Sequence, residues 1–112
     1  MIEQGDLLLV PFPFSDQSGR KVRPVIVMSI NGFNIASEDI IVVGVTSSIS
    51  KDKYTINLGN KNLDEGKLHT DCCIKVENIL KLDKELIIKK IGKVNKNTCK
   101  EIVSKLNEII NC

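Results

Sequence analysis

Aromatic side chains are scarce in this sequence, which has no tryptophan and only Phe12, Phe14, Phe33 and Tyr54 as aromatic residues. A platform that stacks many single-stranded bases is built from several aromatic rings, so we do not expect one here. An excess of charge of one sign is also lacking, because 16 basic residues are balanced by 14 acidic ones and the formal net charge is +2. Overall charge therefore does not predict nucleic-acid binding, which must rest on where lysine and arginine cluster.

Ligands for a metal site are few. No two of the four cysteines have CxxC spacing, and His69 is the only histidine. A structural zinc site needs four well-spaced ligands, so neither a zinc site nor a cofactor is predicted. We expect the cysteines to be free thiols in a reducing cytosol. The acidic residues sit singly on separate predicted loops, which does not favour a two-metal cluster: Asp16, Asp39, Asp52 and Asp64.

Long hydrophobic runs are lacking as well, and we expect no secretory leader. No apolar stretch approaches the ~20 residues of a membrane span. A signal peptide begins with a positively charged region followed by an apolar one, whereas this N-terminus carries the acidic residues Glu3 and Asp6. The expected location is therefore the cytoplasm, with no membrane partner. A chain of 112 residues fits one hydrophobic core, which predicts a single domain over residues 1–112.

Short apolar stretches separated by polar turns dominate the first two thirds of the chain. Their period and their β-branched content predict strands at Leu7–Phe12, Val22–Ser29, Ile40–Thr46, Tyr54–Leu58 and Asp71–Val76. Between these strands, Asn31-Gly32 and the segment 59–66 are predicted to be turns.

The last third changes to a helical period. Residues 83–91 predict a short helix that Gly92 closes, and Lys93-Val94 could add one strand. Thr98 and Glu101 match a capping box at the start of an amphipathic C-terminal helix. Many short strands followed by helices predict a mainly β fold, a small and strongly bent antiparallel barrel decorated by short helices.

Arg23 and Thr46 are the candidates for chemistry on a phosphate. Arg23 opens a strand after the polar loop 15–21, and Pro24 holds it in an extended conformation. A guanidinium makes two parallel hydrogen bonds to a phosphate and keeps its charge. Thr46 ends a buried strand, where its hydroxyl could donate to a phosphate oxygen. Taken alone, each residue has an ordinary alternative: an arginine paired with a surface carboxylate, and a threonine in a turn.

An ordered set of short motifs resembles the MazF/PemK-like toxins of toxin–antitoxin pairs. The set is Gly5-Asp6, then Arg23-Pro24 ahead of a Val/Ile strand, then Val43-Gly44-Val45-Thr46-Ser47, with Glu77-Asn78-Ile79 in support. The resemblance covers nearly the whole chain. It implies an SH3-like barrel, of the kind also found in CcdB-like toxins, that usually forms a homodimer. It also implies that Arg23 and Thr46 match the two principal catalytic positions of the family.

Several further residues are candidates for binding the substrate. Ser47 and Ser48 are possible secondary hydrogen-bond donors, and Asp71 could either orient a catalytic group or cap a turn. A basic rim could track a phosphate backbone or could simply be solvated loop charge; its members are Arg20, Lys21, Lys51 and Lys53. His69 fits a surface-loop histidine better than a general acid or base.

One position departs from the family pattern. Many relatives carry a basic residue directly after the triplet that matches Glu77-Asn78-Ile79, whereas this chain has Leu80. If that position holds RNA, Lys81 or Lys75 must take its place. The general base stays unassigned, because the loop 15–21 has neither a histidine nor an aromatic residue.

The resemblance implies a toxin that is a metal-independent, sequence-selective endoribonuclease. It would cut single-stranded RNA by attack of the 2′-hydroxyl, and a cognate antitoxin protein would neutralise it. Fold alone does not separate this function from a non-catalytic barrel-fold toxin or binding module that acts on a protein target such as gyrase. A catalytically inert homologue kept as a binding domain is a third alternative.

Overall fold

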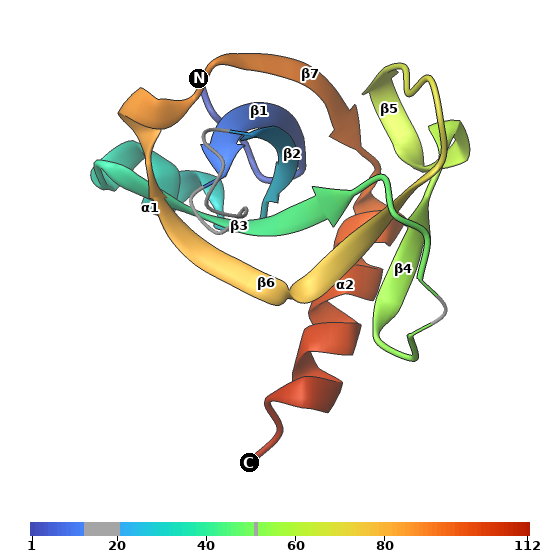
Figure 1. Cartoon of the computed structure of the whole chain (residues 1–112). Coiled ribbons are helices and arrows are strands. Elements are labelled where there is room, and N and C mark those ends of the chain that lie inside the picture. Colours follow the sequence, from blue (N-terminus) through green and yellow to red (C-terminus); the bar gives the residue numbers. More distant parts are fainter. Residues whose placement is uncertain (13–20, 51) are drawn as a thin grey trace.

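The computed structural model describes residues 1–12, 21–50 and 52–112 of the chain (Figure 1). Its strands are β1 (Asp6–Phe12), β2 (Lys21–Val27), β3 (Asp39–Thr46), β4 (Thr55–Leu58), β5 (Leu63–Gly66), β6 (Cys72–Asp83) and β7 (Lys89–Val94). Its helices are α1 (Asn31–Ala36) and α2 (Lys96–Ile109), with single 3-10 turns η1 (Asn60–Asn62) and η2 (Lys84–Leu86). None of the described helices is long and apolar enough to span a membrane.

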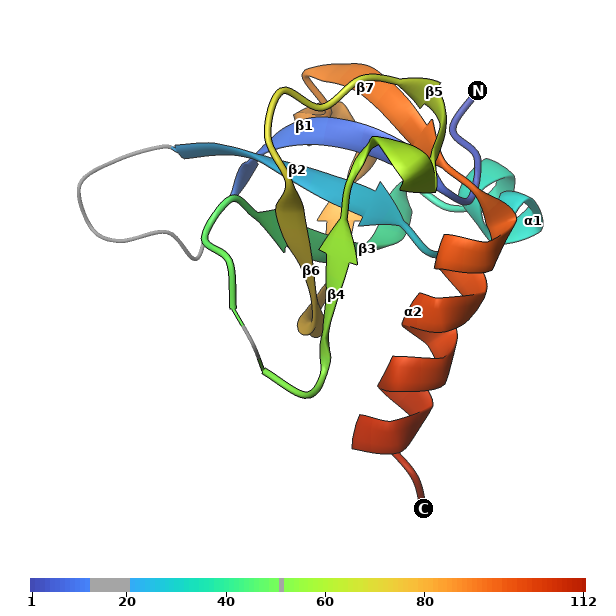
Figure 2. The same ribbon diagram turned by 90° about the vertical axis from the view of Figure 1, so that its right-hand side faces the viewer.

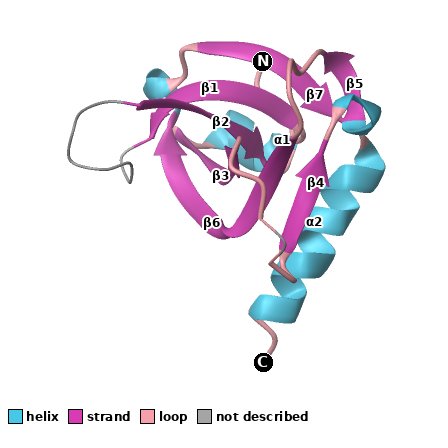
Figure 3. Cartoon of the chain, turned by 45° about the vertical axis from the view of Figure 1, so that its right-hand side comes forward, coloured by secondary structure: helices cyan, strands magenta, loops and turns pink. Residues whose placement is uncertain are grey.

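All seven strands belong to one antiparallel sheet with the order β4-β6-β3-β2-β1-β7-β5. The sheet curls into a half-barrel around β1 and β2, and β6 wraps round its lower side in the view of Figure 1. The strands and helices are coloured separately in Figure 3, which shows α2 standing outside the curled sheet. The predicted mainly β fold, a bent barrel with helical additions, is confirmed.

The three central strands β1, β2 and β3 are apolar on both faces, because the side chains on each face belong to a separate hydrophobic cluster. Ile26 and Val43 belong to one cluster, which Ile102 of α2 joins, while their neighbours Val25 and Val42 belong to the other. Successive side chains of a strand point to opposite faces, so a strand covered on both sides has no polar alternation. The unbroken apolar stretch of β3 thus has its explanation in burial on both faces.

The helix predicted over residues 83–91 is wrong. Asp83 instead ends β6 and caps the single turn η2, where its Oδ1 accepts a hydrogen bond of 2.9 Å from the Glu85 N–H. The chain then enters β7, which pairs with β1 on one side and with β5 on the other. Ile91 therefore serves a strand, while Ile87 caps the end of η2 and packs against the second hydrophobic cluster. Pairing partners far away in the sequence decided between the two periods.

Two predicted turns also contain regular structure. Asn31-Gly32 begins α1 rather than a hairpin turn, and the segment 59–66 contains η1 and the edge strand β5. Gly66 closes β5 with a positive φ of 85°. A Cβ at this glycine would collide with the carbonyl oxygen of Ile91, so the close approach of β5 to β7 requires a glycine here.

The C-terminal helix is confirmed, but its cap is not the predicted one. Asn95 caps α2 by accepting a hydrogen bond of 2.9 Å from the Thr98 N–H, and Thr98 is buried one turn inside. Ile102 packs against the sheet. Val103 and Ile110 are 45% and 61% exposed, and the C-terminal end of α2 projects past the sheet (Figure 2). Part of the apolar stripe of α2 thus faces away from the protein's own core.

Candidate functional site

Pro24 ends the pairing of β2 with β3. The two strands pair at Val27↔Val42, Ile26↔Val43 and Val25↔Gly44, and no pair follows. The Met28 N–H donates to the carbonyl of Ile41 on the β3 side at 2.8 Å. Because peptide directions alternate along a strand, position 24 would also turn its N–H toward β3. A proline has no N–H to donate there, so the ladder stops.

The strands part where the two candidate catalytic residues stand. Continuing the register of Val25↔Gly44 by two residues sets Arg23 of β2 opposite Thr46 of β3. Residues directly opposite each other in an antiparallel pair project to the same face. Both side chains are partly buried. On its other side Arg23 pairs with Val10 of β1, which keeps its backbone in the sheet. The geometry therefore directs a guanidinium and a hydroxyl to one face of the opened end of the sheet.

The hydroxyl of Thr46 is held in a local turn. Its Oγ1 accepts a hydrogen bond of 3.1 Å from the Ser48 N–H. A hydroxyl that accepts one bond still has its own proton to donate. Ser47 and Ser48 are both exposed beside it.

A row of cross-strand neighbours extends from Thr46 over the next two strands. Thr46 pairs with Cys73 of β6, and Cys73 pairs with Asn57 of the edge strand β4. The Cys73 thiol is fully buried, with its Sγ 3.5 Å from the backbone N of Ser50 and 3.8 Å from Oδ1 of Asn57. The segment after Thr46 thus folds back over Cys73. Sequence reasoning missed Cys73 and Asn57, because only the strand register brings them beside Thr46.

The other predicted site residues are spread more widely. Arg20 and Lys51 lie outside the described residues, as does the side chain of Lys21. Lys53 precedes β4 and holds its Nζ 5.5 Å from the centre of the Tyr54 ring. Thr55 of β4 and Gly44 of β3 both pair with Lys75 of β6, so they lie in one cross-strand row. Lys53 lies two residues before Thr55 and is therefore on the side of this row away from Thr46.

The segment that leads into β6 carries two more candidates. The Asp71 carboxylate lies against Gly59, where a Cβ would be only 3.1 Å from its Oδ1. That contact places the Asp71 carboxylate beside the residue that follows β4. His69 is exposed, as a surface-loop histidine would be.

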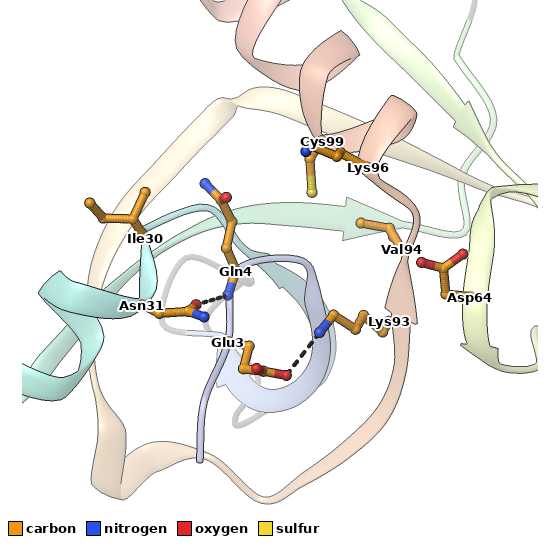
Figure 4. A pocket seen from close by; sticks show the side chains of 9 residues that line it. All are labelled: Glu3, Gln4, Ile30, Asn31, Asp64, Lys93, Val94, Lys96 and Cys99. Atoms are coloured by element: carbon orange, nitrogen blue, oxygen red, sulfur yellow. Dashed lines mark hydrogen bonds and ion pairs between the residues drawn. The ribbon is translucent and has the colours of Figure 1, made fainter.

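The opposite end of β2 carries an ionic cluster. In Figure 4, Glu3 and Lys93 line a hollow of about 440 Å³ together with Asn31 and Cys99. The Lys93 ammonium donates to Glu3 Oε1 at 2.8 Å, which lowers the pKa of Glu3 and raises the pKa of Lys93. Burial raises the pKa of the Cys99 thiol, so this cysteine stays protonated at neutral pH. These contacts fasten the N-terminal segment to β7.

A second ion pair involves Asp6, whose side chain is almost fully buried. The Lys90 ammonium lies 3.3 Å from Asp6 Oδ1 and 2.9 Å from Glu65 Oε2. No hydrogen bond reaches Oδ1 of Asp6 among the described residues, so the ion pair is what compensates this oxygen. Glu65 and Asp6 raise the pKa of Lys90. The pair joins the end of β5 to the start of β1 and serves the fold rather than the opened end of the sheet.

The model of the PemK-like, MazF-like toxins of type II toxin–antitoxin systems matches residues 3–110. The chain belongs to this family.

Solved structures share the fold of this PemK/MazF-like toxin at low sequence identity. MazF from Deinococcus radiodurans is 16% identical with a TM-score of 0.80, over 99% of this chain and 97% of that chain. An endoribonuclease from a mycobacterial species, in complex with its cognate antitoxin, is 18% identical with a TM-score of 0.77, over 96% and 93%. The MazF-mt6 toxin of Mycobacterium tuberculosis is 11% identical with a TM-score of 0.75, over 92% and 93%. The expected family and fold are confirmed.

Within this PemK/MazF-like toxin, Lys75 lies closer to Thr46 than Lys81 does. Lys75 stands opposite Gly44, two residues from Thr46 along the strand, and its Nζ is 4.0 Å from Glu77 Oε2. Lys81 pairs with Asp39 at the other end of β3, at 3.7 Å. Because Gly44 has no side chain, nothing at that position stands between Lys75 and the end of the sheet where β2 and β3 part. Lys75 is therefore the better candidate for the basic residue that Leu80 replaces.

Proposed function

We propose that this PemK/MazF-like toxin is a metal-independent endoribonuclease that cuts single-stranded RNA. The observation that carries the proposal is the register of β2 and β3, which projects Arg23 opposite Thr46 just where Pro24 ends the pairing. Membership of the toxin family supports the same activity. Among the described residues, no three side chains of His, Cys, Asp or Glu come together as a metal site would need.

The reaction requires one bond to form and one to break. The 2′-hydroxyl oxygen attacks the adjacent phosphorus, and the bond from phosphorus to the 5′-oxygen breaks. The 2′-hydroxyl loses its proton, and the departing 5′-oxygen gains one. Negative charge builds on the phosphorane between these events. Arg23 binds the non-bridging oxygens through its planar fork and stabilises that charge, and the Thr46 hydroxyl donates a further hydrogen bond. Water or a residue still unassigned takes the first proton.

Single-stranded RNA is the expected substrate because its bases can be splayed out and read on their edges. A-form duplex hides those edges in a deep, narrow groove. We therefore propose that cutting is sequence-selective, with the loops at the opened end of the sheet deciding the sequence. Ser47 and Ser48 supply exposed donors next to Thr46.

We further propose that the toxin is a cytoplasmic homodimer of single-domain subunits, held in check by a cognate antitoxin. Relatives of the same fold were solved with antitoxins, including MazE–MazF from Deinococcus radiodurans. The exposed apolar side chains of α2, such as Val103 and Ile109, suit a subunit interface. Light scattering at micromolar concentration tests the dimer, and a monomer mass would reject the dimer without touching the nuclease.

The test of the activity is incubation of purified protein with a long mixed RNA in excess EDTA, followed by mapping of the ends. We expect cutting to persist and to leave a 2′,3′-cyclic phosphate on the upstream fragment. Loss of cutting in chelator with rescue by Mg²⁺ would refute the mechanism. Growth arrest by a protein that never cuts RNA would instead favour a toxin acting on a protein target.

A further inference from the structure

A second hollow lies between the edge strand β4 and the helix α2, with a volume of about 510 Å³. That volume is within the range of pockets that hold small molecules. Ile49 and Asp52 line it from the segment ahead of β4, Asn57 from β4 itself, and Glu101 and Lys105 from α2. Figures 1 and 2 show β4 and α2 standing side by side along this region.

The hollow lies near the opened end of the sheet. Asn57 stands in the same cross-strand row as Thr46, with only Cys73 between them. Two strand spacings amount to roughly 10 Å. The segment from Thr46 to Ser50 runs from one place to the other, and at its end the Ser50 N–H donates to Cys73 Sγ. A strand of RNA held at Thr46 would need only a short continuation along this segment to enter the hollow.

The charges of the hollow suit a nucleobase better than a phosphate. The carboxylates Asp52 and Glu101 oppose the ammonium groups Lys61 and Lys105, so the charges of the described lining residues balance. Lys105 also pairs with Glu108 at 3.7 Å, which weakens its attraction for an anion further. Carboxylates accept hydrogen bonds from the exocyclic amino group of cytosine, and an asparagine amide pairs with both edge groups of adenine.

The side chains that face the hollow are able to make such contacts. Oδ1 of Asn57 accepts a hydrogen bond from the Cys73 thiol, whose Sγ is 3.8 Å away. The amide retains its NH₂ group and a second lone pair on Oδ1 for a ligand. Asp52 uses Oδ1 to accept from the Tyr54 N–H at 3.0 Å, which leaves Oδ2 for another donor. Ile49 is 60% exposed and supplies an apolar surface for the face of a base.

We infer that this hollow is a base-reading subsite for a nucleotide next to the cleaved bond, and that it selects adenine or cytosine over uracil. The inference rests on the proposed nuclease function and adds to it a location for sequence selection. Asn57, Asp52 and Glu101 read the amino edge of the base, while Lys61 and Lys105 offset the repulsion between the two carboxylates and the RNA backbone.

The test uses 2′-O-methyl hexanucleotides, in which the attacking hydroxyl is blocked, with each of the four bases placed in turn at each position. Binding to the purified full-length protein is measured by fluorescence anisotropy for the parent, Asn57→Ala, Glu101→Gln and the control Asn107→Ala. Asn107 is an exposed asparagine of α2 that does not line the hollow. A parallel arm maps the cut ends of a random RNA pool with the same proteins.

We expect the parent to prefer adenine or cytosine over uracil at one position, on the order of tenfold to hundredfold, as for a good bidentate base contact. Asn57→Ala should abolish this preference, Glu101→Gln should reduce it at the same position, and Asn107→Ala should retain it. All variants should melt near the parent temperature, because the substituted side chains are exposed.

The two arms separate the subsite from the nuclease. Cutting by an Asn57→Ala protein with the base preference of the parent would overturn the subsite and leave the nuclease standing. A base preference that depends on Asn57 in a protein that never cuts would support the subsite and overturn the nuclease. A parent protein that neither binds these oligonucleotides nor cuts RNA would overturn both.

Discussion

The two halves of β2 have different surroundings, although they belong to one strand of seven residues. Val25 and Ile26 pair with β1 on one side and with β3 on the other, Val27 pairs with β3, and all three are fully buried. Arg23 and Pro24 pair with β1 alone and are partly exposed. The boundary falls at the proline, whose missing N–H would have faced β3.

The paired half of β2 stabilises the fold of this toxin, whereas we expect the half with one open edge to act on RNA. A strand paired and covered on both sides has no free group for a ligand, but it contributes most to folding. A strand with one open edge contributes less to folding and leaves side chains free for chemistry. Substitutions in the two halves should therefore affect different measurements.

The largest effect should come from Arg23→Ala. Removing one preorganised donor to a developing oxyanion typically slows a reaction by about 10²–10³-fold. We expect such a loss in single-turnover cleavage of RNA, with a melting temperature near that of the parent. Arg23→Lys should be badly impaired too, because an ammonium keeps the charge but lacks the fork geometry. Thr46→Ala should be impaired less. Parent-like cleavage by folded Arg23→Ala would show that the site is assigned wrongly.

The matched change in the paired half is Ile26→Ala. Truncating a fully buried isoleucine costs about 2–5 kcal/mol of the free energy of unfolding. Thermal and urea unfolding should show this loss, while the cleavage rate per folded molecule should stay near that of the parent. Ile26→Val, expected to cost about 0.5–1.5 kcal/mol, gives a folded intermediate point. A large loss of rate in folded Ile26→Val would mean that the two halves of β2 do not act independently.

Pro24→Ala tests the boundary itself. The new N–H would face the carbonyl of Val45 on β3 and allow the ladder to continue toward Arg23 and Thr46. One more hydrogen bond contributes about 0.5–1.5 kcal/mol, and losing a proline costs about 0.4–1 kcal/mol through the unfolded chain. We therefore expect little change in stability, a slowly exchanging amide at position 24 by NMR, and slower cleavage. A protected amide with unchanged cleavage would show that the opening between the strands is not required.

A smaller effect is expected from lysines that touch only the RNA backbone. Lys75→Ala should weaken RNA binding and reduce the slope of log affinity against log salt by about 0.7, the share of one phosphate contact on a single strand. Turnover at saturating RNA should change little. Lys53→Ala should change the slope less, because Lys53 lies beyond the Gly44 row, away from Thr46. A larger change in the salt slope for Lys53→Ala than for Lys75→Ala would place the RNA path along β4 near Tyr54.

The smallest effect should appear at the far end of β2, where Glu3 and Lys93 pair. Lys93 lowers the pKa of Glu3, so the contribution of Glu3 to stability is present above its ordinary pKa and is lost as the pH falls through the lowered one. Glu3 raises the pKa of Lys93, so that contribution is lost only as the pH rises through the raised value. Glu3→Gln should therefore lower the melting temperature slightly near neutral pH and not at acid pH. Glu38→Gln, an exposed carboxylate elsewhere, serves as the control.

Local patterns were sufficient for several elements of this fold. The strands β1, β3 and β4 begin and end within a residue of their predicted bounds, because each is a short stretch rich in apolar residues. The amphipathic period of α2 identified the C-terminal helix. The motif set around Arg23-Pro24 and Val43–Ser47 indicated the family, and the family model over residues 3–110 confirmed it.

Other elements depended on pairing partners far away in the sequence. The segment 83–91 has apolar residues that suit a helix or a strand equally well, and only pairing with β1 and β5 made its last three residues the start of β7. The segment 59–66 is too polar to predict β5 without knowledge of its partner. Exposure of the C-terminal half of α2 was likewise not predictable, since it depends on where the sheet ends.

By itself the sequence determined the mainly β character of this toxin, its family, and the candidacy of Arg23 and Thr46, because those depend on residue types at short spacing. The tertiary structure alone decided that the pairing of β2 with β3 ends at Val25↔Gly44, two residues short of Arg23 and Thr46. It also decided that Cys73 and Asn57 continue the row from Thr46, and that Lys75 lies nearer to Thr46 than Lys81 does. Cross-strand neighbours are separated by tens of residues, and a shift of one residue in register would turn every side chain to the other face. That choice is made by the packing of two whole faces, which no local stretch of sequence contains.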